Sequence, residues 1–225
     1  MSVNLPAFQQ ITDQLKPYHA KLVAVSKIKP PADIQALYNA GQRIFGENYV
    51  QELQEKQAVL PADIEWHFIG HLQSNKVKYI APFVSMIHAV DSFKLLQEIN
   101  KQAAKHQRVI SCLLQVHIAV EETKFGLSEK ELEQLLDQYK EQAGSLSNIR
   151  IAGLMGMASN TDDLQQVRNE FRHLNELRKS LKACFFPGTD DFKELSTGMS
   201  GDYPIALEEG STMVRIGSML FGARY

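Results

Sequence analysis

The chain has 225 residues, of which 44% are hydrophobic and 22% are charged, as in an ordinary globular protein rather than a disordered one. Its 24 Lys and Arg residues are balanced by 26 Asp and Glu residues, which argues against a nucleic-acid-binding protein. The sequence has no apolar stretch long enough to span a bilayer and no secretory signal pattern. Two cysteines, Cys112 and Cys184, are too few for a disulfide framework, so we expect a cytoplasmic protein without membrane or nucleic-acid partners.

Short runs of β-forming residues alternate with segments of helical periodicity along the whole chain. The segment that follows Ser128 begins with a capping box formed by Ser128 and Glu131, and a later helix is expected to carry Asp162 and Asp163 in its first turn. This repeated alternation predicts a parallel sheet. The eight predicted strands are Leu22–Ser26, Arg43–Gly46, Trp66–Gly70, Met86–Val90, Cys112–Val116, Ile151–Met155, Glu194–Thr197 and Met213–Gly217.

Two parallel folds fit this alternation, a closed (β/α)8 barrel and an open, doubly wound sheet. The open sheet would be expected to carry a glycine fingerprint after its first strand, but residues 26–31 read SKIKPP and contain no glycine. A barrel needs eight strands and typically about 250 residues. We therefore predict a single (β/α)8 TIM-barrel domain that covers residues 1–225.

Lys27 is the most informative residue near a strand end. In such barrels the functional residues lie where the strands end, and Lys27 directly follows the first apolar run. A lysine that is shielded from water has a lowered pKa and can form a Schiff base with a carbonyl compound. A solvated loop lysine is the alternative, and it is our interpretation of the nearby Lys29.

Two clusters of glycine and serine follow the predicted seventh and eighth strands. They are residues 196–201, which read STGMSG, and the pair Gly217 and Ser218. Barrels commonly bind phosphate between these two loops, because glycine lets backbone N–H groups approach an anion. The hydroxyls of Ser196, Ser200 and Ser218 could add further donors. Simple turn formation is the competing explanation.

Arg215 lies among apolar residues of the eighth predicted strand. A buried guanidinium needs a partner, because burying an isolated charge is costly. The partner is either a carboxylate, such as Glu208 or Glu209, or a bound ligand, and the sequence leaves both open.

His67 and His71 lie in one predicted strand, where four residues span about 13 Å, so the two rings cannot share a metal ion. His71, at the strand end, is a candidate for hydrogen bonding in the barrel mouth, and His67 is interpreted as a core or rim histidine. No zinc-type cluster occurs elsewhere, and we predict no metal.

Six segments at these strand ends match the signatures of one family. They are residues 24–27 (AVSK), 45–52 (FGENYVQE), 66–76 (WHFIGHLQSNK), 153–155 (GLM), 195–200 (LSTGMS) and 210–217 (GSTMVRIG). The sequence thereby resembles the pyridoxal-phosphate homeostasis proteins, barrels similar to the N-terminal domain of alanine racemase (fold type III). It departs from the family pattern at Thr197, Gly156 and Ser159, and none of these departures affects Lys27 or Arg215.

The resemblance implies a site for pyridoxal 5′-phosphate (PLP). Lys27 would hold the cofactor as a Schiff base and Arg215 would face the pyridine nitrogen. Ser200, Gly217 and Ser218 would help to hold the phosphate. The remaining implied pocket residues are Asn48, His71, Met155 and Ser196.

The function implied by the resemblance is that of a carrier that buffers PLP, maintains vitamin B6 homeostasis and supplies apo-enzymes. A cation facing the pyridine nitrogen disfavours protonation of the ring and so weakens it as an electron sink. We also expect a monomer without the second domain that supplies a base in racemases, since the barrel occupies all 225 residues. A slow amino-acid racemase or related enzyme is the alternative, and a cofactor-free enzyme with a lysine Schiff base is a third.

Overall fold

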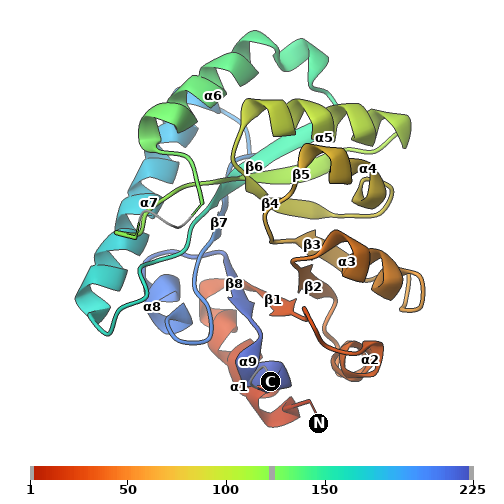
Figure 1. The fold of residues 1–225 in the computed structure, drawn as a ribbon. Coiled ribbons are helices and arrows are strands. Elements are labelled where there is room, and N and C mark those ends of the chain that lie inside the picture. Colours follow the sequence, from red (N-terminus) through yellow and green to blue (C-terminus); the bar gives the residue numbers. More distant parts are fainter. Residues whose placement is uncertain (1–2, 122–124, 223–225) are drawn as a thin grey trace.

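Eight parallel strands close into a barrel in the computed structural model, which describes residues 3–121 and 125–222. Each strand pairs with the next one in the sequence, and the first pairs with the last. The strands form an inner ring and the helices lie outside it (Figure 1). The predicted barrel is confirmed. Its strands are β1 (Lys21–Val25), β2 (Ile44–Glu47), β3 (Glu65–Phe68), β4 (Met86–Val90), β5 (Ile110–Gln115), β6 (Ile149–Met155), β7 (Glu194–Ser196) and β8 (Met213–Ile216).

The helices follow the strands as the sequence periodicity predicts, with one correction at a helix start. The predicted capping box is present, since the Glu131 amide donates to Ser128 Oγ at 3.3 Å and the Ser128 amide donates to Glu131 Oε2 at 2.9 Å. Asp163 does not lie in a first turn but is itself the N-cap, where it accepts hydrogen bonds from two backbone amides, and Asp162 precedes the helix. The main helices are α1 (Leu5–Leu15), α2 (Pro31–Asn39), α3 (Val50–Gln57), α4 (Val77–Ile80), α5 (Phe93–Lys105), α6 (Glu129–Glu141), α7 (Leu164–Phe185), α8 (Tyr203–Glu208) and α9 (Ser218–Phe221).

Alternation along the strands divides the core into two parts. Successive side chains of a strand point to opposite faces, so one set packs against the helices and the other fills the barrel. The outer set includes Phe45, Trp66 and Ile87, which belong to one large cluster with the helical residues. The inner set forms a separate cluster of Val23, Met86, Leu113, Ala152, Met155 and Met213. Within the described part of the chain, no helix is both long and apolar enough to cross a membrane.

A buried ion pair ties α3 to the ends of β1 and β2. Lys56 Nζ lies 2.7 Å from Glu47 Oε1, and the two side chains are 4% and 0% exposed. The same ammonium donates to Glu52 at 2.6 Å and to the Ser26 carbonyl at 2.7 Å. Burial raises the pKa of the Glu47 carboxyl, and Lys56 opposes this effect. The network fixes the backbone at the point where the chain leaves β1.

We expect Lys56→Met to lower the free energy of unfolding by about 3–5 kcal/mol, because the Glu47 carboxyl would then lie buried without its cation. Urea unfolding followed by circular dichroism measures the loss. Lys16→Met is the matched control, since Lys16 forms an exposed pair with Asp13 and its loss should leave the free energy of unfolding almost unchanged. Equal effects of the two variants would show that the buried pair does not hold the fold.

Candidate functional site

A cavity of about 280 Å³ opens where the strands end, which is where barrels of this kind carry their functional sites. This volume is close to the lower end, about 300 Å³, of the range for small-molecule pockets. Seven of the residues singled out from the sequence line it together, although they come from five different strand ends. They are Lys27, Asn48, Met155, Ser200, Arg215, Gly217 and Ser218.

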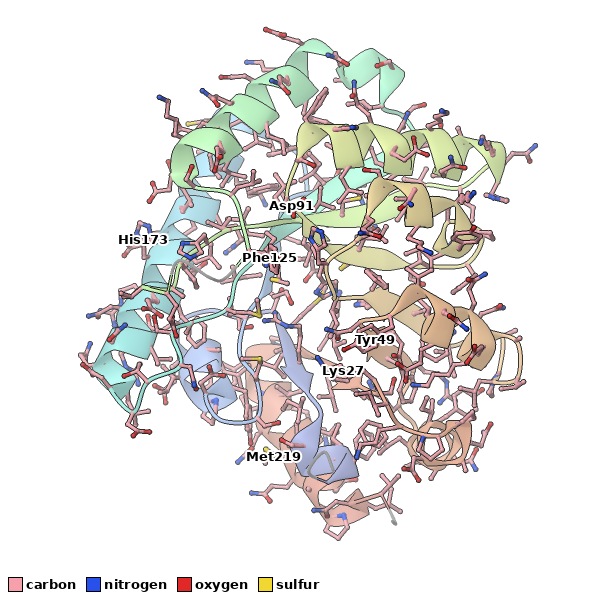
Figure 2. All side chains as sticks on the ribbon, in the orientation of Figure 1. Lys27, Tyr49, Asp91, Phe125, His173 and Met219 are labelled. Carbon is pink, nitrogen blue, oxygen red and sulfur yellow. The ribbon has the colours of Figure 1, made fainter. Side chains whose placement is uncertain are left out.

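The turn that carries Lys27 is held on both sides. Lys56 donates to the carbonyl of the preceding residue, Ser26, and the amide of the following residue, Ile28, donates to Glu52 at 2.5 Å. Ile28 has a φ of 62°, a left-handed conformation that β-branched residues rarely adopt. The Glu52 carboxylate thus stabilises an unfavourable backbone conformation at Ile28, next to the backbone of Lys27. Lys27 is half-buried and lies at the end of β1 (Figure 2).

Arg215 lies at the inner side of the cavity and is 4% exposed. Its Nη1 donates to the Ser196 carbonyl at 2.6 Å and to Ser196 Oγ at 2.7 Å, and its Nη2 donates to the Gly156 carbonyl at 3.0 Å. Burial lowers the pKa of the guanidinium to about 10, so the group remains positively charged at neutral pH.

The two carboxylates considered as partners of Arg215 are bound elsewhere. Glu208 pairs with Arg168, and Glu209 pairs with both Arg168 and Arg172. The structural ion pair left open by the sequence is therefore not formed. Neutral oxygen acceptors hold the Arg215 guanidinium, and its charge is available to a ligand in the cavity.

Close backbone approaches shape the rest of the cavity wall. A Cβ added at Gly217 would lie 3.1 Å from the Val25 carbonyl oxygen, so a larger residue would push β8 away from β1. Gly198 has a φ of 88°, and a Cβ there would lie 2.7 Å from Ala206 Cβ. The Asn48 side-chain oxygen is buried and has no hydrogen-bond partner among the described residues. An acceptor left in this state is suited to a polar group of a ligand.

Two residues expected at the pocket lie elsewhere. Ser196 is fully buried and does not line the cavity, and its hydroxyl accepts a hydrogen bond from Arg215, which does. His71 does not line this cavity; it borders a neighbouring one, where its ring stacks on Phe125 at 5.0 Å and its Nδ1 lies 3.4 Å from Asp91 Oδ2. His71 follows β3, which ends at Phe68, and shares the neighbouring cavity with Asn48, so its role at the site stays a prediction.

Sequence reasoning also missed part of the lining. Ile69, Met157 and Met199 border the cavity, and Lys29, interpreted as solvated, borders it as well. Lys29 Nζ donates to the Phe221 carbonyl at 2.9 Å, a contact with the far end of the chain that no local pattern could indicate. Within residues 3–121 and 125–222, no group of three or more His, Cys, Asp or Glu side chains could hold a metal ion.

Comparison with known proteins places these residues in a family. Residues 3–225 match the family model described as alanine racemase, N-terminal domain. A pyridoxal phosphate homeostasis protein of Aquifex aeolicus is 42% identical over 206 residues, which cover 91% of this chain and 87% of that protein. The human protein of the same name is 40% identical over 91% of this chain and 76% of its own length.

Solved structures agree with the sequence matches. PipY of Synechococcus elongatus without PLP is 36% identical, with a TM-score of 0.88 over 96% of this chain and 99% of PipY. PipY with PLP bound is 35% identical, with a TM-score of 0.86. Alanine racemase from Bartonella henselae, 16% identical with a TM-score of 0.70 over 99% of this chain and 60% of its own, shares the fold. The chain therefore belongs to the alanine racemase N-terminal domain family and, within it, to the pyridoxal phosphate homeostasis proteins.

Proposed function

We propose that this chain is a cytoplasmic monomer of one barrel domain that binds PLP reversibly and buffers its supply to PLP-dependent apo-enzymes. The observation that carries the proposal is the convergence of Lys27 and the buried cation Arg215 on one cavity. The relatives named for pyridoxal phosphate homeostasis, and PipY with PLP bound, support the same ligand.

The donor set of the cavity fits the polar parts of this cofactor. Lys27 supplies an amine for the aldehyde carbon, and Arg215 supplies N–H donors for the pyridine nitrogen. Ser200, Gly201, Gly217 and Ser218 also line the cavity, and their backbone N–H and hydroxyl groups are suited to hold the phosphate. The buried, unpartnered oxygen of Asn48 is an acceptor for a donor group on the ring. We therefore assign these residues to cofactor binding, with Met155 as an apolar part of the wall.

When bound, PLP supplies an electrophilic carbonyl and a pyridine ring that withdraws electrons. Arg215 keeps its positive charge at neutral pH, so a protonated ring nitrogen beside it would place two cations face to face. The site therefore favours an unprotonated ring, which is the weaker electron acceptor. This property supports binding and release over amino-acid chemistry.

A slow racemase is the second candidate, because the Lys27 amine could also move a proton. Racemisation needs a proton donor or acceptor on each face of the substrate. The lysines that line the cavity are Lys27 and Lys29, and Lys29 Nζ donates to the carbonyls of Phe221 and Gly222 at 2.9 and 3.4 Å. These contacts with the backbone support a holding role of Lys29 in the wall rather than proton transfer, and so favour the carrier.

We expect purified protein incubated with PLP to gain a visible absorption band and to pass the cofactor to an apo-enzyme. Lys27→Ala should lose the band and retain PLP at least about tenfold less well in gel filtration, because the covalent attachment is gone. Lys94→Ala, an exposed lysine on α5, is the matched control and should bind and transfer as the wild type does. A band that persists in Lys27→Ala would overturn the assignment, and its absence from the wild type would favour the cofactor-free enzyme.

Incubation of the PLP-loaded protein with single-enantiomer amino acids separates the carrier from the racemase. We expect at most one molecule of the opposite enantiomer to form per molecule of protein, because the ring facing Arg215 is a weak electron sink. Chiral chromatography of the amino acid after long incubation at high protein concentration measures this. Sustained loss of optical purity over many turnovers would refute the carrier proposal.

A further inference from the structure

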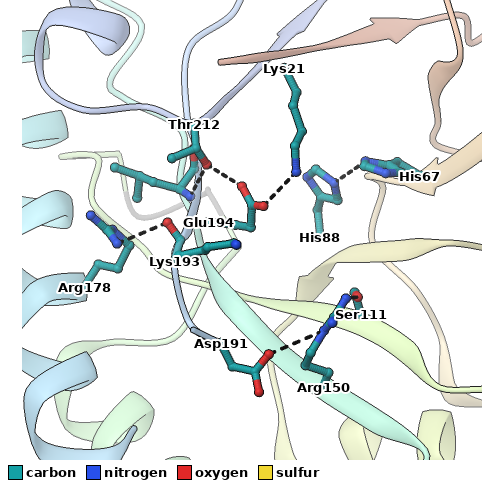
Figure 3. Close-up of polar contacts among 11 residues, drawn as sticks. Lys21, His67, His88, Ser111, Arg150, Arg178, Asp191, Lys193, Glu194 and Thr212 are labelled. Atoms are coloured by element: carbon teal, nitrogen blue, oxygen red, sulfur yellow. Dashed lines mark hydrogen bonds and ion pairs between the residues drawn. The ribbon is translucent and has the colours of Figure 1, made fainter. Parts of the chain in front are cut away.

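A chain of hydrogen bonds continues from Arg215 into the interior of the barrel. Ser196 Oγ, which accepts from Arg215, lies 3.0 Å from His88 Nδ1, and His88 Nε2 lies 2.9 Å from His67 Nδ1. Ser196 and His88 are fully buried and His67 is 3% exposed. Figure 3 shows the contact between the two histidines.

These side chains occupy positions that barrels usually fill with branched apolar residues. His67 and His88 come from the neighbouring strands β3 and β4, whereas Ser196 and Arg215 come from β7 and β8 on the other side of the closed barrel. The hydrogen bonds therefore cross the interior. A buried polar network of this kind rigidifies its surroundings when all of its members are satisfied.

The direction of each hydrogen bond follows from the chemistry of arginine. A guanidinium can only donate, so Ser196 Oγ accepts from Arg215. Among the residues that the structure describes, the hydroxyl has one other partner, and its own proton is therefore donated to His88 Nδ1. His88 must then carry its proton on Nε2, from which it donates to His67 Nδ1. His67 in turn carries its proton on Nε2.

Both rings are neutral in this environment. Burial lowers the pKa of His67 to about 3, with a smaller effect from the Lys21 ammonium. Burial also lowers the pKa of His88 well below its usual range, and His67 and Arg215 add to the effect. In this neutral series of hydrogen bonds, the Ser196 oxygen accepts from the guanidinium and every N–H or O–H group points away from it. This orientation stabilises the positive charge of Arg215.

The hydrogen-bonded series ends, on the side away from Arg215, at a second cavity of about 790 Å³ at the amino ends of the strands. His67 lines this cavity, together with Lys21 and Glu194, which pair at 2.8 Å (Figure 3). The hydrogen-bonded side chains thus extend from the Arg215 cavity to the opposite end of the barrel. No atom of His67 or His88 lines the cavity that contains Lys27.

We propose that Ser196, His88 and His67 form a polarised relay that fixes the orientation of the Arg215 guanidinium and thereby sets the affinity of the site for PLP. All three are positioning residues, since they act on the ligand through Arg215. The inference rests on the proposed function for the identity of the ligand, but the relay itself is a property of the cofactor-free protein.

The protonation pattern is tested without cofactor. In protein labelled with ¹⁵N-histidine, we expect His67 and His88 to be neutral Nε2–H tautomers whose shifts do not change between about pH 5 and pH 9. Single His67→Gln and His88→Gln variants assign the signals. An Nδ1–H tautomer at either ring, or titration near the ordinary pKa of about 6.5, would overturn the relay.

The link to Arg215 is tested with two serine variants. Ser196→Ala removes the bridge between Arg215 and His88, and we expect PLP affinity in absorbance titrations to fall about tenfold, as for a lost charge-assisted hydrogen bond. The His88 tautomer should also change. Ser211→Ala is the matched control, because Ser211 is 3% exposed but its hydroxyl proton is shared among backbone carbonyls, of which those of Thr197 and Met213 lie at 2.9 Å. It should lower thermal stability and leave PLP affinity within about twofold.

The outcomes separate the relay from the proposed function. If the wild type binds PLP through Lys27 but Ser196→Ala and Ser211→Ala bind it equally well, the relay is refuted and the proposed function stands. If the wild type binds no PLP, the proposed function fails, and the histidine tautomers alone decide whether the relay exists.

Discussion

The burial of one positive charge, that of Arg215, is the constraint on which the barrel mouth depends. An unpaired charge in a protein interior is costly. Neutral oxygens accept the hydrogen bonds of this guanidinium, and the Asp202 carboxylate acts on it as a nearby charge. Its compensation comes from the Ser196 carbonyl and hydroxyl and the Gly156 carbonyl, which belong to the ends of β7 and β6. The charge is thus stabilised by fixed dipoles, and it remains available to a ligand.

The neighbouring wall of the site, at the end of β1, is held by a second buried ionic group. Lys56 and Glu47 join α3 to the strand ends, and Glu52 and Lys56 fix the turn on either side of Lys27. One wall therefore positions an amine and the other positions a cation. These contacts fix the backbone from which the Lys27 side chain reaches the cavity, where the proposed covalent attachment of PLP would form.

The sequence was sufficient for the barrel and for the residues next to strand ends, because alternation and apolar runs are local patterns. Lys27 and the Gly217 region follow strands directly and were found in this way. The partners of Arg215 could not be predicted, because two of its three acceptors are backbone carbonyls of other strands. The burial of His67 agrees with its interpretation as a core or rim histidine, but its contact with His88 depends on strand register and barrel closure. His71 lies beyond the end of β3, so the direction of its side chain does not follow from strand alternation.

The protonation state of the bound cofactor ring tests most directly whether Arg215 organises this site. PLP labelled with ¹⁵N at the pyridine nitrogen can be bound to the protein and its chemical shift measured across neutral pH. We expect the shift of an unprotonated nitrogen that accepts a hydrogen bond, because the Arg215 cation disfavours a second positive charge beside it. The shift of a protonated pyridinium at neutral pH would contradict this placement and remove the physical reason for assigning the protein to carriage of the cofactor.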